Sequence, residues 1–335
     1  MAGNGDDSVK VVPVRHYGRW VGALVALVAV AMLVHTLLSK VPTGQFSCSA
    51  KSGVRRCHAL VNWRFSWNVV HQYFTTSEVL HGLLKTIELT VLSMTIGIVL
   101  GVIIAIMRRS HNRLLSSTAW SYTWFFRGTP VLVQLLFWFN IAALYTTVTL
   151  GLPFLPVTFL KINVIAILTP FNSAMVALGL NEAAYMSEIA RAGLIAVDEG
   201  QIEAATSLGM TRGQTLRMVV LPQAMRVIIP PTGNEVISML KTTSLASSVG
   251  VIELLGAVTN ISAANFQTMP LLIVASIWYL MVTTVLSVGQ FYLERHFAKG
   301  ALRTPPPTPI QRARQDLRGI LAKFRTPRVA TGRAP

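Results

Sequence analysis

The chain has 335 residues, of which 52% are hydrophobic and only 13% are charged, about half the charged fraction of roughly 25% that soluble domains carry. This composition excludes a soluble enzyme, a disordered regulator, a disulfide-rich secreted domain and a solenoid. The formal net charge is +16. It does not indicate nucleic-acid binding, because half of it lies in the Pro-rich tail 299–335, and basic ends are typical of membrane proteins.

Six segments are apolar enough to cross a bilayer as helices of about 20 residues. In chain order they are 20–38, 86–107, 131–150, about 164–190, 234–258 and 271–292. The sequence therefore predicts an all-α polytopic membrane protein with about six transmembrane helices. The first segment also resembles a signal peptide, but it is longer than an ordinary h-region and no clear small-x-small cleavage site follows it, so we favour a retained anchor.

Basic residues orient the spans. The short loop 108–113, with Arg108, Arg109 and Arg113, is expected to be cytoplasmic. The N-terminus 1–19, the connection 191–233 and the tail 299–335 are then cytoplasmic as well, and the loop 39–80 is extracytoplasmic. That outer loop is itself basic, but long loops cross the membrane largely regardless of charge.

Cys48 and Cys57 both fall in the expected outer loop. In an oxidising compartment a disulfide between them is feasible. Two free thiols are the alternative, and the sequence alone does not choose between them.

Gly97 and Gly101 form a Gly-x-x-x-Gly pattern in the second span. Small residues at this spacing usually allow close packing of helices. We therefore interpret them as packing residues.

The connection between spans four and five has an ordered pattern. Good helix formers run up to Gly209, which suits a left-handed C-terminal cap, and Thr211 can cap a following helix. Ile202, Ala205 and Leu208 recur on one face of the first helix. The pattern predicts a helix, a sharp turn and a second helix at the membrane surface, with an apolar face offered to a partner.

Within this connection Glu203-Ala204-Ala205 is followed by Gly209, Val219 and Leu221-Pro222. This spacing resembles the hallmark of the integral membrane permease subunits of bacterial ABC importers, with Val in place of the usual Ile.

Three further segments resemble the polar amino acid branch of that family, the histidine and glutamine permease type. They are Arg127-Gly128-Thr129-Pro130, then Ala184-Tyr185 with Glu188 and Arg191, and Lys241-Thr242-Thr243-Ser244-Leu245, in which Thr242 replaces a frequent acid. The resemblance covers about residues 80–299.

The resemblance implies a five-span type I importer core at 81–298, with the span 20–38 added before it and a flexible tail, 299–335, after it. It also implies a coupling loop at about 193–233 that contacts a separate ATPase through Gly200, Gln201, Glu203, Ala204, Ala205, Gly209, Leu221 and Pro222. The alternative is that Gly209 and Pro222 only terminate helices.

The candidate residues for the translocation path are Glu182, Tyr185, Glu188, Lys241 and Ser244. Ionisable groups inside a membrane need a cavity or a partner. Glu182 or Glu188 could bind a substrate ammonium group, or form structural pairs such as Glu188 with Arg191. Lys241 could face an anionic carboxylate, extend to the cytoplasmic interface, or pair with Glu188.

These features predict a permease subunit of an ATP-driven importer for polar amino acids in the bacterial inner membrane. The chain lacks a phosphate-binding Gly-x-x-x-x-Gly-Lys-Ser/Thr loop, so ATP and Mg²⁺ are expected in the partner ATPase, and neither a cofactor nor a metal in this chain. A second permease, either another copy or a homologue, and an extracytoplasmic solute-binding protein are the other expected partners. The alternative is a stand-alone secondary amino acid transporter.

Overall fold

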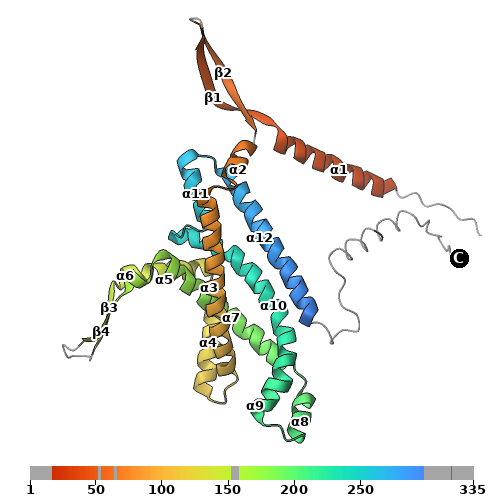
Figure 1. Cartoon of the computed structure of the whole chain (residues 1–335), viewed down its shortest axis with the longest axis vertical. Coiled ribbons are helices and arrows are strands. Elements are labelled where there is room, and N and C mark those ends of the chain that lie inside the picture. The colour runs from red at the N-terminus through yellow and green to blue at the C-terminus, as the bar shows by residue number, and fades with distance from the viewer. Residues whose placement is uncertain (1–16, 52–53, 64–65, 152–157, 298–317, 319–335) are drawn as a thin grey trace, which may run out of the picture. The chain divides into compact units, whose positions relative to one another are not determined.

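The computed structural model describes residues 17–51, 54–63, 66–151, 158–297 and 318 (Figure 1). Most of the expected N-terminal segment 1–19 and of the tail 299–335 lies outside these residues. The chain divides into two compact units, and the larger one is Ser66–Leu302.

The described residues of the first unit form one helix and one hairpin. Helix α1, Tyr17–Leu38, matches the expected first span, and its described apolar side chains, such as Leu24 and Leu33, are exposed, as expected of a helix that is apolar on all sides in lipid. Strands β1 and β2, Lys40–Lys51 and Val54–Trp63, pair in antiparallel fashion. The sequence did not predict this hairpin within the expected outer loop.

Two helices of the larger unit are long and apolar enough to cross a membrane alone: α3, Ser77–Arg108, and α12, Thr268–Phe297. They confirm the predicted spans 86–107 and 271–292. The short helix α2, Trp67–Tyr73, precedes α3 and packs against α12.

Helix α7, Pro170–Ile195, is the central element and packs along α3. A Cβ atom at Gly97 would lie 2.5 Å from Cγ of Glu182, and one at Gly101 would lie 2.6 Å from Cβ of Met186. Both glycines therefore bring α3 against α7, which confirms their predicted packing role.

The predicted span 131–150 is wrong in its extent. The helix at this place ends at Leu144, and it forms a sharp bend with the helix that precedes it. Helices α4, Arg113–Gly128, and α5, Val131–Leu144, meet at 106°, and the proline at 130 lies at the break, where it cannot continue the α4 hydrogen bonds. The chain then forms a hairpin of β3, Thr147–Gly151, and β4, Thr158–Asn163.

The predicted fourth span begins later than expected. Residues from 164 form only the short helix α6, Val164–Ile167, and α7 starts anew at Pro170. The side chain of Thr169 accepts a hydrogen bond from the backbone N–H of Asn172, and proline suits the first helical turn. These two residues therefore fix the start of α7.

The predicted fifth span, 234–258, is also interrupted. It corresponds to parts of three helices: α10, Leu221–Thr242, the 3₁₀ helix η2, Thr243–Val249, and α11, Leu254–Asn265. The helices bend by 44° at the break, where Gly250 adopts a φ of +84°. By length and composition the described helices supply two spans, or up to four if each bent pair is one span.

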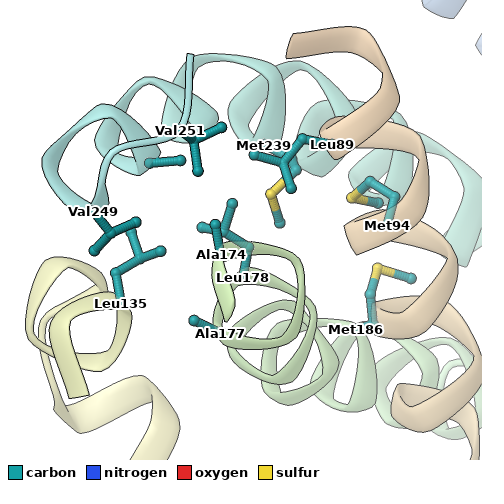
Figure 2. Packing of buried hydrophobic residues seen from close by; sticks show 11 residues of the cluster. Leu89, Met94, Leu135, Ala174, Ala177, Leu178, Met186, Met239, Val249 and Val251 are labelled. Atoms are coloured by element: carbon teal, nitrogen blue, oxygen red, sulfur yellow. The ribbon is translucent and has the colours of Figure 1, made fainter. Parts of the chain in front are cut away.

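The main apolar core joins these elements (Figure 2). Leu178 of α7 lies near its centre, with Leu89 of α3, Leu135 of α5, Met239 of α10 and Val249 of η2 around it. The core therefore holds both bent helix pairs against α7.

Candidate functional site

The connection that follows α7 folds as predicted into a helix, a turn and a second helix. Helix α8, Glu199–Ser207, starts at Asp198, whose side chain accepts a hydrogen bond from the N–H of Gly200 at 2.8 Å. Gly209 has a φ of +77°, a conformation that glycine adopts without the penalty of a Cβ atom. The predicted glycine cap is therefore confirmed.

Thr211 caps the second helix, as predicted, and forms a capping box with Gln214. Helix α9, Arg212–Thr215, continues through the π-helical turn η1, Leu216–Val220, into α10. Pro222 is the second residue of α10 and follows directly on the wide π-helical turn. The segment from the cap to α10 is thus a continuous helical element with one wide turn.

The predicted apolar face of α8 is split in the structure. Ala205 is buried and Ile202 packs against a small core that includes Val220 of η1. Leu208 is 83% exposed, and Glu203 and Ala204 are exposed as well. Glu203, Ala204 and Leu208 therefore belong to the exposed side of α8, whereas Ala205 holds α8 to its own chain.

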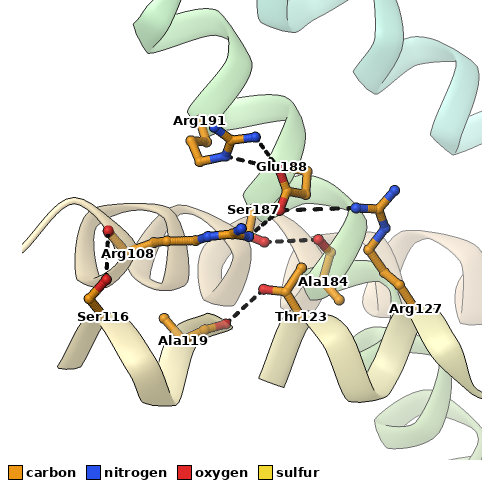
Figure 3. A network of polar contacts seen from close by, with 9 residues as sticks. All are labelled: Arg108, Ser116, Ala119, Thr123, Arg127, Ala184, Ser187, Glu188 and Arg191. Carbon is orange, nitrogen blue, oxygen red and sulfur yellow. Dashed lines mark hydrogen bonds and ion pairs between the residues drawn. The ribbon is translucent and has the colours of Figure 1, made fainter. Parts of the chain in front are cut away.

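Glu188 of α7 lies at the centre of a cluster of arginines (Figure 3). Its carboxylate bonds to Arg108 of α3, and it pairs with Arg191 at 2.8 Å. Arg127 of α4 lies 4.0 Å away. The predicted pairing of Glu188 with Arg191 is confirmed, and the pairing with Lys241 is wrong because arginines from three helices occupy the carboxylate.

Glu182 lies two turns before Glu188 and is 4% exposed. Its Oε1 atom has no hydrogen-bond partner among the described residues. It interacts electrostatically with Glu235 of α10, and Glu235 in turn interacts with Arg127. The two helices that carry these carboxylates, α7 and α10, pack against each other.

Tyr185 joins the two acidic positions of α7. The guanidinium group of Arg127 lies over its ring, 5.3 Å from the ring centre, a favourable cation–π distance. Two of the predicted path residues, Tyr185 and Glu188, thus come together at Arg127, whereas Glu182 lies farther along α7. Sequence reasoning missed the contribution of Glu235, although its position within an apolar span was a signal.

Lys241 and Ser244 lie in two different helical segments, α10 and η2. The α-helix ends at Thr242 and the chain tightens into η2, which changes the direction of the later side chains. The Ser244 hydroxyl donates to the backbone oxygen of Lys241 at 2.7 Å. Lys241 itself is exposed and forms no ion pair among the described residues.

Two amide side chains hold the bend between α4 and α5. Nε2 of Gln134 donates to the backbone oxygens of Phe126 and Thr129 at 2.9 and 3.1 Å. Nδ2 of Asn181 donates to the same Phe126 oxygen at 2.9 Å. Because the break leaves these carbonyl groups without helical donors, the amides satisfy them. Both amides lie in apolar stretches, which is the sequence signal for this role.

A second junction surrounds Glu253, which is fully buried. Its carboxylate accepts hydrogen bonds from the N–H groups of Leu255 and Gly256, both at 2.8 Å, and from the hydroxyl of Tyr279 at 2.9 Å. The hydroxyl of Thr86 donates to it as well. Glu253 therefore starts α11 and links it to α3 and α12.

Comparison with known proteins identifies the family. Residues 97–299 match the family described as "Binding-protein-dependent transport system inner membrane component". An arginine transport system permease protein of Corynebacterium glutamicum is 44% identical over 298 residues, which are 88% of this chain and 85% of the relative. An L-cystine transport system permease protein of Bacillus subtilis is 40% identical over 68% of this chain and 90% of its own length.

Solved structures show the same fold. A chain of an amino acid ABC transporter crystallised with histidines is 35% identical, with a TM-score of 0.57, and the match covers 69% of this chain and 98% of that one. The comparisons support a permease of an ABC importer and not a stand-alone secondary transporter. The chain therefore belongs to the family of inner membrane components of binding-protein-dependent transport systems.

Proposed function

We propose that this chain is the permease of an importer for cationic amino acids. Its helices form the translocation path, and α8 transmits the closure of a partner ATPase to them. The family membership supports the transport role, and the relative at 44% identity, an arginine permease, supports the cationic substrate.

The observation that carries the substrate class is the Glu182 carboxylate. It is buried, one of its oxygens has no partner among the described residues, and α10, which carries Glu235, packs against α7. Two acids placed together in a membrane protein favour a cation between them. A guanidinium or ammonium group could bind to both carboxylates, whereas Glu188 is already occupied by arginines.

The coupling role of α8 rests on its exposed side chains. A rigid helix that is capped at both ends presents Glu203, Ala204 and Leu208 outward. Its inner side packs against η1, which continues directly into α10. Movement of α8 by a partner would therefore reach Glu235 on α10 without an intervening flexible segment.

The same proposal includes the remaining partners and the orientation. ATP and Mg²⁺ bind to the ATPase, a second permease completes the pore, and a solute-binding protein delivers the amino acid from outside. The end of the molecule that carries α8 then faces the cytoplasm, because the ATP is there.

The test is uptake of radiolabelled arginine by proteoliposomes that contain the complete transporter and its binding protein. Glu182→Gln should lower arginine uptake by more than about tenfold, because one charge-assisted contact is lost. The matched control, Glu88→Gln, changes an exposed carboxylate on α3 that pairs with Lys85, and it should transport normally. Unchanged uptake by Glu182→Gln would refute the acidic site.

A further inference from the structure

A basic cavity lies where α3 and α7 end and α4 begins. Its volume is about 580 Å³. Four arginines line it, Arg108, Arg109, Arg113 and Arg191, together with His111, and no acidic residue of the described part of the chain lines it. A cavity of this charge selects an anion.

The positive charge of the cavity is not neutralised by the protein around it. Glu188 pairs with Arg108 and Arg191. Arg109 and Arg113 are exposed and form no ion pair in the part of the chain that the structure describes. The four arginines and Glu188 together therefore leave a formal excess of three positive charges.

One wall of the cavity is suited to lipid. Trp120 of α4 lines the cavity, is 53% exposed and stacks on Trp124 with ring centres 6.3 Å apart. Leu114 and Phe125 of the same helix are exposed too. Tryptophans typically lie at the boundary between membrane and water. The cavity thus combines arginines, which bind phosphate in bidentate fashion, with an exposed aromatic surface beside them.

We propose that this cavity binds the phosphate-bearing headgroup of an anionic phospholipid. The phosphate contacts Arg109 and Arg113, and the acyl chains lie along the Trp120 side of α4. Basic pockets between helices at a membrane surface bind such headgroups. The inference requires that this end of the helices lies at a membrane surface, and it is independent of the transported substrate.

The bound lipid would also affect the coupling region. Arg109 and Ser110 line a second cavity, of about 660 Å³, together with Ile202 and Thr206 of α8. A lipid held by Arg109 therefore stabilises the turn between α3 and α4 directly beside the helix that contacts the ATPase.

The test is lipid binding to the complete purified transporter, measured by native mass spectrometry during titration with phosphatidylglycerol, phosphatidylcholine or inorganic phosphate. The double variant Arg109→Gln/Arg113→Gln leaves the Arg108 and Arg191 pairs with Glu188 intact. It should weaken phosphatidylglycerol binding by about tenfold or more. The matched control, Arg217→Gln/Arg226→Gln, removes two exposed arginines that do not line the cavity, and it should bind like the unchanged protein.

A second measurement locates the acyl chains. Phosphatidylglycerol with brominated chains should quench tryptophan fluorescence, and Trp120→Phe should remove part of that quenching.

Equal phosphatidylglycerol binding by the cavity variant and the unchanged protein, or equal weakening by the control variant, would overturn the proposal. Displacement of the lipid by inorganic phosphate at similar concentration would overturn a lipid occupant, and lost ATPase assembly with unchanged lipid binding would show that a protein covers this surface.

Discussion

Asn181 of α7 donates a hydrogen bond to the side-chain oxygen of Gln134 on α5, with 3.1 Å between the two atoms. This contact joins the central helix to the bend between α4 and α5, and both amides also bind the backbone oxygen of Phe126. The bend is therefore held by side chains from two helices, and its geometry depends on both.

We expect Gln134→Leu to destabilise the permease, because the Thr129 carbonyl loses its donor from Nε2 and the buried Asn181 amide loses its contact with Oε1 of Gln134. An unsatisfied buried polar group costs about 1–3 kcal/mol. The thermal inactivation temperature of the purified transporter should fall. Asn140→Leu is the matched control, since this exposed amide binds only within its own helix. An equal fall of the inactivation temperature in both variants would contradict the conclusion that the hydrogen bonds of Gln134 stabilise the bend between α4 and α5.

Gly97→Ala should also destabilise the protein, by about 1–3 kcal/mol from overpacking. The added methyl group would lie 2.5 Å from Cγ of Glu182 and separate α3 from α7. Gly289→Ala on α12 is the control, because an added Cβ atom would meet nothing within 4 Å. The test is thermal denaturation of both variants in detergent. Equal stability of the Gly97→Ala and Gly289→Ala variants would refute the close packing of α3 on α7.

A disulfide between Cys48 and Cys57 remains a prediction. The backbone register of the first hairpin pairs these two positions directly, and paired antiparallel residues have Cα atoms about 4.5–5.5 Å apart, within the range that a disulfide spans. Alkylation of the unfolded protein before and after reduction should add two labels only after reduction. Labelling without reduction would instead identify two free thiols.

The sequence predicted those parts of the fold that depend on local patterns. Long apolar runs identified α3 and α12, Gly209 and Thr211 identified the turn after α8, and Gly97 identified close packing. It did not predict the breaks. Pro130 and Gly250 were visible, but a broken helix is stable in a membrane only if distant groups satisfy its carbonyl and N–H groups. Those groups come from Asn181, Gln134, Thr86 and Glu253, whose proximity to the breaks depends on the tertiary packing.

The candidate site shows the same limit. The spacing of Glu182, Tyr185 and Glu188 on one helix could be read from the sequence. Their neighbours could not, because Arg108, Arg127 and Glu235 come from three other helices. The path role of Lys241 stays a prediction; the sequence did not show that the α-helix ends at Thr242 and that Ser244 lies in the 3₁₀ helix η2.

The most direct test of the account is the ATPase activity of the reconstituted transporter, with and without loaded binding protein. Glu203→Arg reverses an exposed charge on α8, and Gly209→Pro is incompatible with the φ of +77°. Both should insert normally and lose stimulation by the binding protein, whereas Arg226→Glu, an exposed charge reversal on α10, should retain it. Normal stimulation of both α8 variants would contradict the assignment of α8 as the element that couples ATP hydrolysis to transport.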